Sequence, residues 1–171
     1  MTKKPTFIIL GSILFLLLNF RSVAQGSQER LSTEALQAKV FDLKGNELTL
    51  KEILAQFGDQ PIFIDLWASW CRDCIVGFPQ IKEYQNKYAE VAFTYLSVDK
   101  KEEEWKRGIE RFGLEGAHFR LDDGWNSVFC ESVELDWIPR YMVVNSEGSI
   151  LHYKSIKADD KALKKIIRIN Q

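Results

Sequence analysis

The chain has 171 residues, of which 46% are hydrophobic and 12% aromatic, and its formal net charge is −1. This length and composition are typical of one globular domain with a short additional segment. Without residues 1–24, the chain keeps 20 basic and 24 acidic residues, a net charge of −4. That balance argues against a nucleic acid or an anionic membrane surface as a partner.

The additional segment is N-terminal. Met1–Lys4 is basic, residues 7–20 are apolar, and Ser22–Ala24 are small. These are the three parts of a secretory signal peptide, and the apolar run is short for a membrane span. We therefore expect a signal peptide over residues 1–24 and a location in the periplasm or another extracytoplasmic compartment. Arg21 keeps open an alternative, in which this segment is uncleaved and tethers the protein to a membrane.

Residues 25–37 are polar and lack a periodic pattern, which indicates a flexible lead-in to a domain over residues 38–171. Residues 38–50 predict a β-hairpin whose turn lies at Lys44–Asn46.

Thr49 and Glu52 have the spacing of a capping box and predict the start of a short helix. Residues 61–67 are apolar almost throughout, as in a strand that is buried on both faces. The following segment, up to about Ala89, has helical apolar spacing around an internal Pro79.

Residues 91–98 predict a second buried strand, and residues 100–112 predict an amphipathic surface helix. A short strand is expected at residues 118–121 and a further helix at residues 125–133.

Residues 141–144 and 149–153 flank the turn-forming residues 145–148, which is a strong hairpin signal. Residues 159–169 predict a terminal helix. Strands that alternate with helices and then end in a hairpin predict an α/β fold, a central mixed sheet with helices on both faces. Its first strands should be parallel, and the hairpin should add antiparallel strands.

Cys71 and Cys74 form a Cys-x-x-Cys motif directly after the strand at residues 61–67. At a strand-to-helix junction, the free amides and positive dipole end of the helix favour thiolate at the first cysteine, and thiolate is the reactive form. The motif predicts redox chemistry on thiols and disulfides. Half of a zinc site is the alternative, but the chain offers only Cys130 and two isolated histidines as further ligands. We therefore expect no metal.

Cys130 leaves the chain with an odd number of cysteines. It lies beside Phe129, and a free cysteine among apolar residues is usually a small core residue. The alternative is a third redox thiol.

Asp65 lies six residues before Cys71, inside the apolar strand. A charged carboxylate is unfavourable there, so its pKa should be raised and it could exchange a proton with Cys74. In the alternative, strand alternation turns Asp65 toward a polar face.

The run Asp65–Cys74, the later Pro79 and the Ile138-Pro139 pair before a hairpin together resemble the thioredoxin fold. The N-terminal hairpin, the helix-strand insertion at residues 100–123 and the export signal resemble the TlpA/ResA-like branch of exported thiol-disulfide oxidoreductases. The resemblance extends from about Val40 to the C-terminus.

This resemblance implies a redox-active disulfide between Cys71, the nucleophile, and Cys74, the resolving thiol, with Asp65 as proton carrier. It also implies that Pro139 is a cis-proline beside the disulfide, where the backbone binds substrate. Trp70, Ile138, Pro139 and Arg140 are the expected substrate-binding residues. Arg140 departs from the family, in which threonine is usual, and its charge could favour thiolate at Cys71 or select acidic clients. In the alternative, its side chain points away from the site.

The implied function is reduction of protein disulfides outside the cytoplasm, for clients such as cytochrome c apoproteins, with no cofactor. The partners would be client thiols and disulfides and a membrane-linked electron donor or acceptor. Two alternatives are a thiol peroxidase and a non-enzymatic binding or chaperone module. The Pro-x-x-x-Thr-x-x-Cys element of peroxidases is absent around Cys71.

Overall fold

The computed structural model describes residues 30–170, so the expected signal peptide lies outside the described residues. The strands are β1 (Lys39–Phe41), β2 (Glu47–Thr49), β3 (Ile62–Trp67), β4 (Ala92–Ser97), β5 (Ala117–Leu121), β6 (Arg140–Val144) and β7 (Ile150–Ser155). The α-helices are α1 (Thr33–Leu36), α2 (Leu50–Ala55), α3 (Arg72–Lys87), α4 (Glu102–Phe112), α5 (Val128–Ser132) and α6 (Lys161–Ile169). Within this part of the chain, no helix combines the length and hydropathy that a membrane crossing requires.

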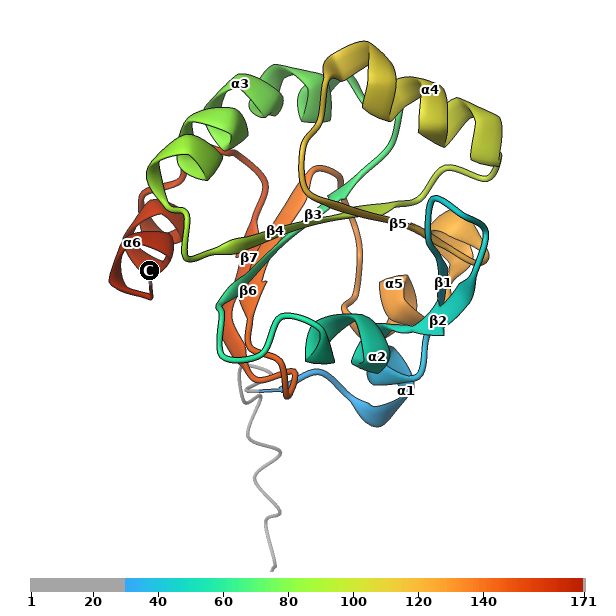
Figure 1. Cartoon of the computed structure of the whole chain (residues 1–171), viewed down its shortest axis with the longest axis horizontal. Helices are drawn as coiled ribbons and strands as arrows, with labels where there is room; N and C mark the ends of the chain where they lie inside the picture. The colour runs from blue at the N-terminus through green and yellow to red at the C-terminus, as the bar shows by residue number, and fades with distance from the viewer. Residues whose placement is uncertain (1–29, 171) are drawn as a thin grey trace, which may run out of the picture.

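The strands form one mixed sheet in the order β2-β1-β5-β4-β3-β6-β7 (Figure 1). Strands β3, β4 and β5 are parallel neighbours, which confirms the expected parallel centre. The β6–β7 hairpin joins β3 in antiparallel orientation, and the β1–β2 hairpin joins β5 in the same way. Because β6 runs opposite to β3, the start of β6 lies at the end of the sheet where β3 terminates. That end carries the candidate site.

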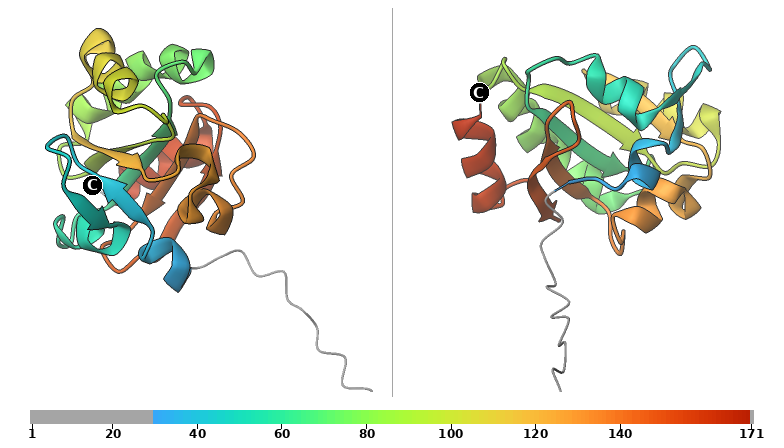
Figure 2. Two further views of the ribbon diagram at one scale, coloured as in Figure 1. Left: turned by 90° about the vertical axis from the view of Figure 1, so that its right-hand side faces the viewer. Right: turned by 90° about the horizontal axis from the view of Figure 1, so that it is seen from below.

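Helices cover both faces of the sheet, as expected (Figure 2). Helices α3 and α4 lie over one face, and α1, α2 and α5 lie on the other (Figure 1). Helix α6 packs against β6 and β7, and the Tyr84 hydroxyl of α3 donates to the Ala158 carbonyl just before α6, at 2.9 Å.

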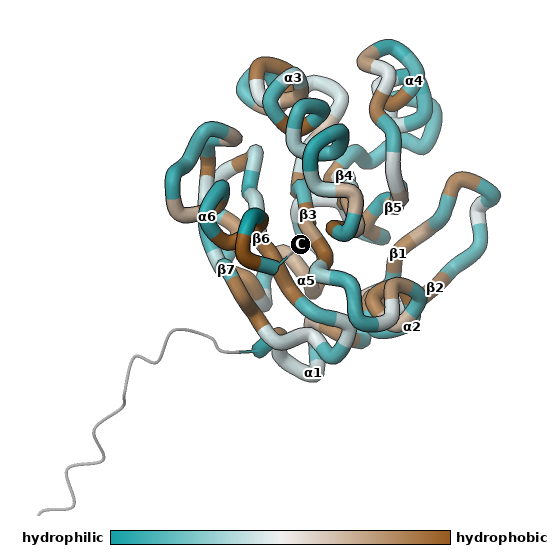
Figure 3. Tube along the Cα trace, turned by 60° about the vertical axis from the view of Figure 1, so that its left-hand side comes forward, coloured by the Kyte–Doolittle hydropathy of each residue, from teal (hydrophilic) through white to brown (hydrophobic). Residues whose placement is uncertain are grey.

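The central strands are buried on both faces because helices cover both. Every residue of β3, β4 and β6 is buried. Figure 3 shows hydrophobic residues concentrated along these strands, whereas hydrophilic residues alternate with hydrophobic ones along the helices. Aromatic contacts join neighbouring strands, with ring centroids 5.0 Å apart for Phe63 and Phe93. Burial of this apolar area is the main source of the fold's stability.

The capping box is present at the start of α2, as predicted. The Glu52 amide donates to the Thr49 hydroxyl at 3.2 Å, and the Thr49 amide donates to the Glu52 carboxylate at 2.7 Å. Such a cap stabilises a helix by about 1 kcal/mol.

The segment assigned to a flexible lead-in is partly ordered. Ser32 caps the one-turn helix α1, and Leu31 and Ala35 are buried. Arg30 forms an isolated β-bridge with Ser149, at the turn between β6 and β7. A single helical turn has too few residues for a periodic apolar pattern, so periodicity could not predict it.

The helix expected over residues 125–133 is shorter and is interrupted. A 3₁₀ turn spans Gly124–Asn126, and α5 begins only after Ser127, whose hydroxyl accepts from the Cys130 amide at 3.3 Å. Ser127 is thus a helix cap in the middle of the predicted helix.

Candidate active site

A disulfide joins Cys71 and Cys74 at the N-terminus of α3, with an S–S distance of 2.06 Å. Cys71 is the N-cap residue, and the Cys74 amide donates to its Sγ atom at 3.1 Å. Cys71 keeps 5% of its surface exposed, whereas Cys74 is fully buried. The sulfur of Cys71 therefore has the helix dipole and an amide donor beside it, and both stabilise a thiolate when the bond is reduced.

Asp65 lies on the face of the sheet that α3 covers. Its register partners are Tyr95 on β4 and Tyr141 on β6, and directly paired residues point to the same face. The Tyr95 hydroxyl reaches Gln85 of α3 at 3.5 Å. The Tyr141 hydroxyl occupies the space where a Cβ atom would lie at Gly77 of α3. Asp65 is therefore beneath the helix that carries both cysteines.

The Asp65 carboxyl is completely buried, and neither of its oxygens has a hydrogen-bond partner among the described residues. Desolvation raises the pKa of this carboxyl well above its ordinary value. The strand does not turn Asp65 toward a polar surface, so that alternative is wrong. Burial of this kind favours the neutral, protonated form of the carboxyl.

A second buried carboxylate, Asp99, holds the loop before Cys71. Its oxygens accept from the Ser69 amide at 2.9 Å, the Ser69 hydroxyl at 2.8 Å and the Ser97 hydroxyl at 2.8 Å. The Trp67 ring lies edge-on against Phe78 of α3, with centroids 5.6 Å apart. These contacts fix the strand-to-helix turn from both sides. The sequence analysis assigned no role to Asp99, and the available signal was a carboxyl directly after the predicted strand at residues 91–98.

The Ile138–Pro139 peptide bond is cis, as the resemblance implied. Ile138 lines a groove of about 420 Å³ beside Cys71. The other residues around this groove are Trp70, Arg72, Asp73, Trp125, Asp136 and Trp137. Trp70 is 61% exposed and Trp137 is 53% exposed, so the aromatic surface around the disulfide is open to solvent.

Pro139 lines a neighbouring groove of about 570 Å³, which shares Asp73 and Trp137 with the first. The exposed apolar residues Val76 and Ile156 border it. Sequence reasoning predicted Trp70, Ile138 and Pro139 near the disulfide but assigned no part in the site to Trp125 or Trp137.

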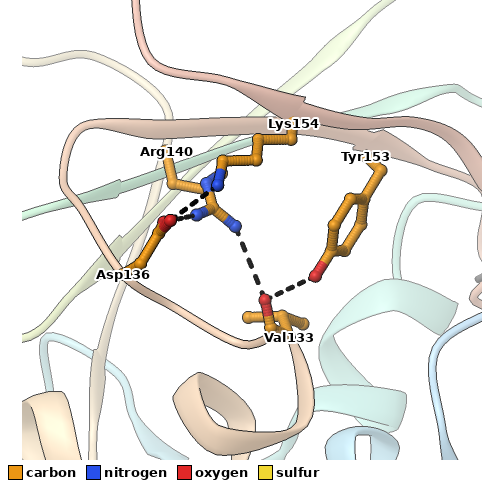
Figure 4. Close-up of polar contacts among 5 residues, drawn as sticks. All are labelled: Val133, Asp136, Arg140, Tyr153 and Lys154. Atoms are coloured by element: carbon orange, nitrogen blue, oxygen red, sulfur yellow. Dashed lines mark hydrogen bonds and ion pairs between the residues drawn. The ribbon is translucent and has the colours of Figure 1, made fainter.

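The structure corrects the expected role of Arg140. Its side chain is fully buried and does not line either groove. It lies instead among residues of the loop and of β7 (Figure 4). It pairs with the Asp136 carboxylate, and its Nη1 lies 3.5 Å from the Val133 carbonyl oxygen. The guanidinium is thus already neutralised and shielded, so it offers no direct contact to an acidic client.

Cys130 is 2% exposed, and burial raises the pKa of its thiol to about 11. Its sulfur lies 3.6 Å from the Gly124 carbonyl oxygen. These surroundings agree with the prediction of a core residue, because a buried neutral thiol is a poor nucleophile. Among residues 30–170, no three histidine, cysteine, aspartate or glutamate side chains cluster in a way that could hold a metal ion.

Comparison with known proteins matches residues 58–150 to a family model described as thioredoxin-like. Thiol-disulfide oxidoreductase ResA of Bacillus cereus is 27% identical over 130 residues, which cover 75% of this chain and 71% of ResA. A thioredoxin of Alicyclobacillus acidocaldarius is 36% identical over 47 residues, or 27% of this chain and 45% of that protein.

Solved structures share the fold. The thioredoxin domain of a thiol-disulfide oxidoreductase from Bacteroides vulgatus superimposes with a TM-score of 0.67 at 23% identity, covering 85% of this chain and all of that one. A thiol:disulfide interchange protein from Bacteroides sp. gives a TM-score of 0.65 at 24% identity, covering 78% of this chain and 85% of that one.

Proposed function

Because this chain belongs to the thioredoxin-like family, we propose that it is an exported thiol-disulfide oxidoreductase that reduces disulfides in client proteins. The observation that carries the proposal is the Cys71–Cys74 disulfide at the N-terminus of α3, beside an apolar groove and above a buried, unpartnered Asp65. Similarity to ResA over three quarters of the chain supports the same activity.

In the reduced enzyme, the Cys71 thiolate attacks one sulfur of the client disulfide. The client S–S bond breaks, a mixed disulfide forms with Cys71, and the second client sulfur leaves as a thiolate that takes up a proton. Cys74 then attacks the Cys71 sulfur, which releases the client as a dithiol and leaves the Cys71–Cys74 disulfide. Two electrons have moved to the client, and a donor dithiol must return them to the enzyme.

The second step requires Cys74 to lose its proton in a buried setting. Asp65 is the proposed acceptor: its carboxyl lies beneath α3 without a partner, and whenever it is ionised, burial makes it gain a proton readily. When the enzyme is reduced again, the same carboxyl can return that proton.

Client docking is assigned to the groove beside Cys71. Trp70 offers an exposed aromatic surface there, and Ile138 lines the same groove. Pro139 lines the neighbouring groove, and Trp137 borders both. Pro139 has no amide hydrogen, and its ring fixes the local backbone. The preceding backbone is therefore the proposed partner for an extended client segment.

The direction of electron flow and the cellular setting belong to the same proposal. Reduction, rather than oxidation, follows from the resemblance to the TlpA/ResA-like branch. The signal-peptide pattern of residues 1–24 supports export, and a membrane-linked dithiol is the proposed electron donor. Cytochrome c apoproteins, which need free thiols for haem attachment, are proposed as one class of client.

Insulin reduction by dithiothreitol tests the activity. We expect Cys71→Ser to abolish catalysis, because it removes the attacking sulfur, and Cys74→Ser to accumulate mixed disulfides that mass spectrometry can detect. Cys130→Ser is the matched control and should retain the wild-type rate, since Cys130 is buried away from the groove. Full activity of Cys71→Ser would refute the mechanism.

Equilibration with glutathione tests the direction. A reduction potential near −270 mV, as in thioredoxin, is expected for a reductase. A potential near −120 mV, as in a strong oxidant, would contradict the proposed direction while leaving the disulfide chemistry intact.

A further inference from the structure

We propose that Arg140 is a positioning residue, whose buried side chain fixes the segment 134–139 that forms one wall of the groove beside Cys71. The inference rests on the proposed function, because the groove is where that function places the client. The family resemblance does not supply it, since threonine is usual at this position.

The first observation is the burial of a full positive charge. The Arg140 side chain has no exposed surface, and an unpaired buried guanidinium is strongly unfavourable. Its charge is compensated by Asp136, and the Val133 carbonyl lies at 3.5 Å. Both partners belong to the chain that leads from α5 to Pro139, so movement of this chain would leave the arginine without partners.

The second observation is that side chains of β7 contact the same two residues, Val133 and Asp136. The Lys154 ammonium lies 2.7 Å from the second Asp136 oxygen, and the Tyr153 hydroxyl donates to the Val133 carbonyl at 2.6 Å. Figure 4 shows the side chains of Arg140, Tyr153 and Lys154 extending from the two strands of the hairpin toward the loop. The loop is therefore attached to β6 and to β7 at Val133 and at Asp136.

The third observation is that regular secondary structure does not support the segment, whose other contacts are two backbone hydrogen bonds at Glu134 and Leu135 and the burial of Ile138. The segment contains no helix or strand, and Glu134 has a left-handed backbone with φ of 46°. A non-glycine residue in that region costs about 1 kcal/mol and persists only when its surroundings enforce it. Trp137 is 53% exposed, so packing of its own side chain does little to orient it. Ile138 is held by its own burial, so Arg140 and Asp136 act chiefly on where the groove presents Trp137.

The test compares two variants, Arg140→Met and Asp136→Asn. The second removes the charge of the exposed partner in the same ion pair, so it should still fold if Arg140→Met does not. Arg120→Met is the matched control, because it removes a partly buried arginine that stacks on Phe41, away from the groove. Each variant is measured by hydrogen exchange of the amides in residues 134–138 and by steady-state insulin reduction.

We expect at least tenfold faster exchange in this segment for Arg140→Met and a smaller increase for Asp136→Asn. The KM for insulin should rise at least fivefold while kcat changes less than twofold, because the dithiol chemistry does not involve Arg140. Arg120→Met should leave exchange in residues 134–138 at the wild-type rate. Unchanged exchange in both test variants, or a fall in kcat at constant KM, would overturn the inference. Failure of the wild-type protein to reduce insulin would instead refute the proposed function, and exchange would still decide whether Arg140 positions the loop.

Discussion

Two buried aspartates lie close to the dithiol turn, and their surroundings give them opposite chemistry. Asp99 accepts three hydrogen bonds from Ser69 and Ser97, so its charge is compensated and its role is to hold the loop. Asp65 has no hydrogen-bond partner for either oxygen among residues 30–170, so its neutral form is favoured over the charged one. Both carboxyls are fully buried, so the hydrogen-bond donors around them, and not their burial, distinguish Asp99 from Asp65, the proposed proton carrier.

Asp65→Asn should slow insulin reduction at pH 7 by about a hundredfold, the usual contribution of a positioned acid or base. The deficit should shrink as the pH rises above about 8.5, where an ordinary thiol ionises without help. Asp59→Asn, in an exposed loop, is the control and should keep the wild-type pH–rate profile. The same pH dependence in Asp65→Asn and wild type would exclude Asp65 as the proton carrier.

At the scale of elements, the close contact between α3 and β6 depends on Gly77. A Cβ atom at this position would collide with the Tyr141 hydroxyl, which is buried beneath the helix. The helix can therefore lie against β6 at Gly77.

Gly77→Ala should lower the free energy of unfolding by about 1–3 kcal/mol, the usual cost of overpacking. At an exposed position in a helix, the same glycine-to-alanine change has the opposite effect and raises the free energy of unfolding by about 1 kcal/mol. Urea denaturation of Gly77→Ala, Tyr141→Phe and the double variant measures the coupling. Tyr141→Phe should recover most of the loss, because it removes the colliding oxygen; additive effects would show that another contact is responsible.

The elements with a strong local signal were predictable from the sequence. The capping box of Thr49 and Glu52 marks the start of α2, and the continuous apolar runs of β3 and β4 reflect strands covered on both faces. Helix α1 was missed because one turn has no period, and the predicted helix over residues 125–133 was too long because the Ser127 cap was overlooked.

The site was predictable where spacing along the chain determines it. The places of Cys71, Cys74 and Asp65 follow from one strand and the helix after it. Trp125 reaches the groove from a segment some fifty positions further on, and no local pattern indicates that contact. The burial of Arg140 likewise depends on strand β7, so its sequence position beside Pro139 wrongly suggested contact with clients.

At the scale of the whole molecule, the burial of Asp65 makes stability depend on pH. The folded protein holds the Asp65 proton above the ordinary pKa of an aspartate, whereas the unfolded chain releases it there. Between those two pKa values the folded state binds more protons, so the contribution of Asp65 destabilises the fold increasingly as the pH rises. The slope is about 1.4 kcal/mol for each pH unit.

Asp65→Asn should therefore be more stable than the wild type at pH 7, and the difference should vanish below about pH 4, where the aspartate is protonated in both states. Urea denaturation of the oxidised proteins at pH 4 and pH 7 measures this. A variant that is equally stable or less stable at pH 7 would show that the carboxyl is not held in its neutral form.

The β-bridge between Arg30 and Ser149 shows at which end of the sheet Arg30 lies. Ser149 follows the end of β6, and β6 begins at the end of the sheet where β3 delivers its chain to the dithiol. Arg30 therefore lies at the end of the sheet opposite to the Cys71–Cys74 disulfide. A domain attached to a surface through the residues before Arg30 would point its disulfide away from that surface. Immobilisation from this side, on a resin or a sensor, should accordingly leave the reactive sulfurs free to meet large clients.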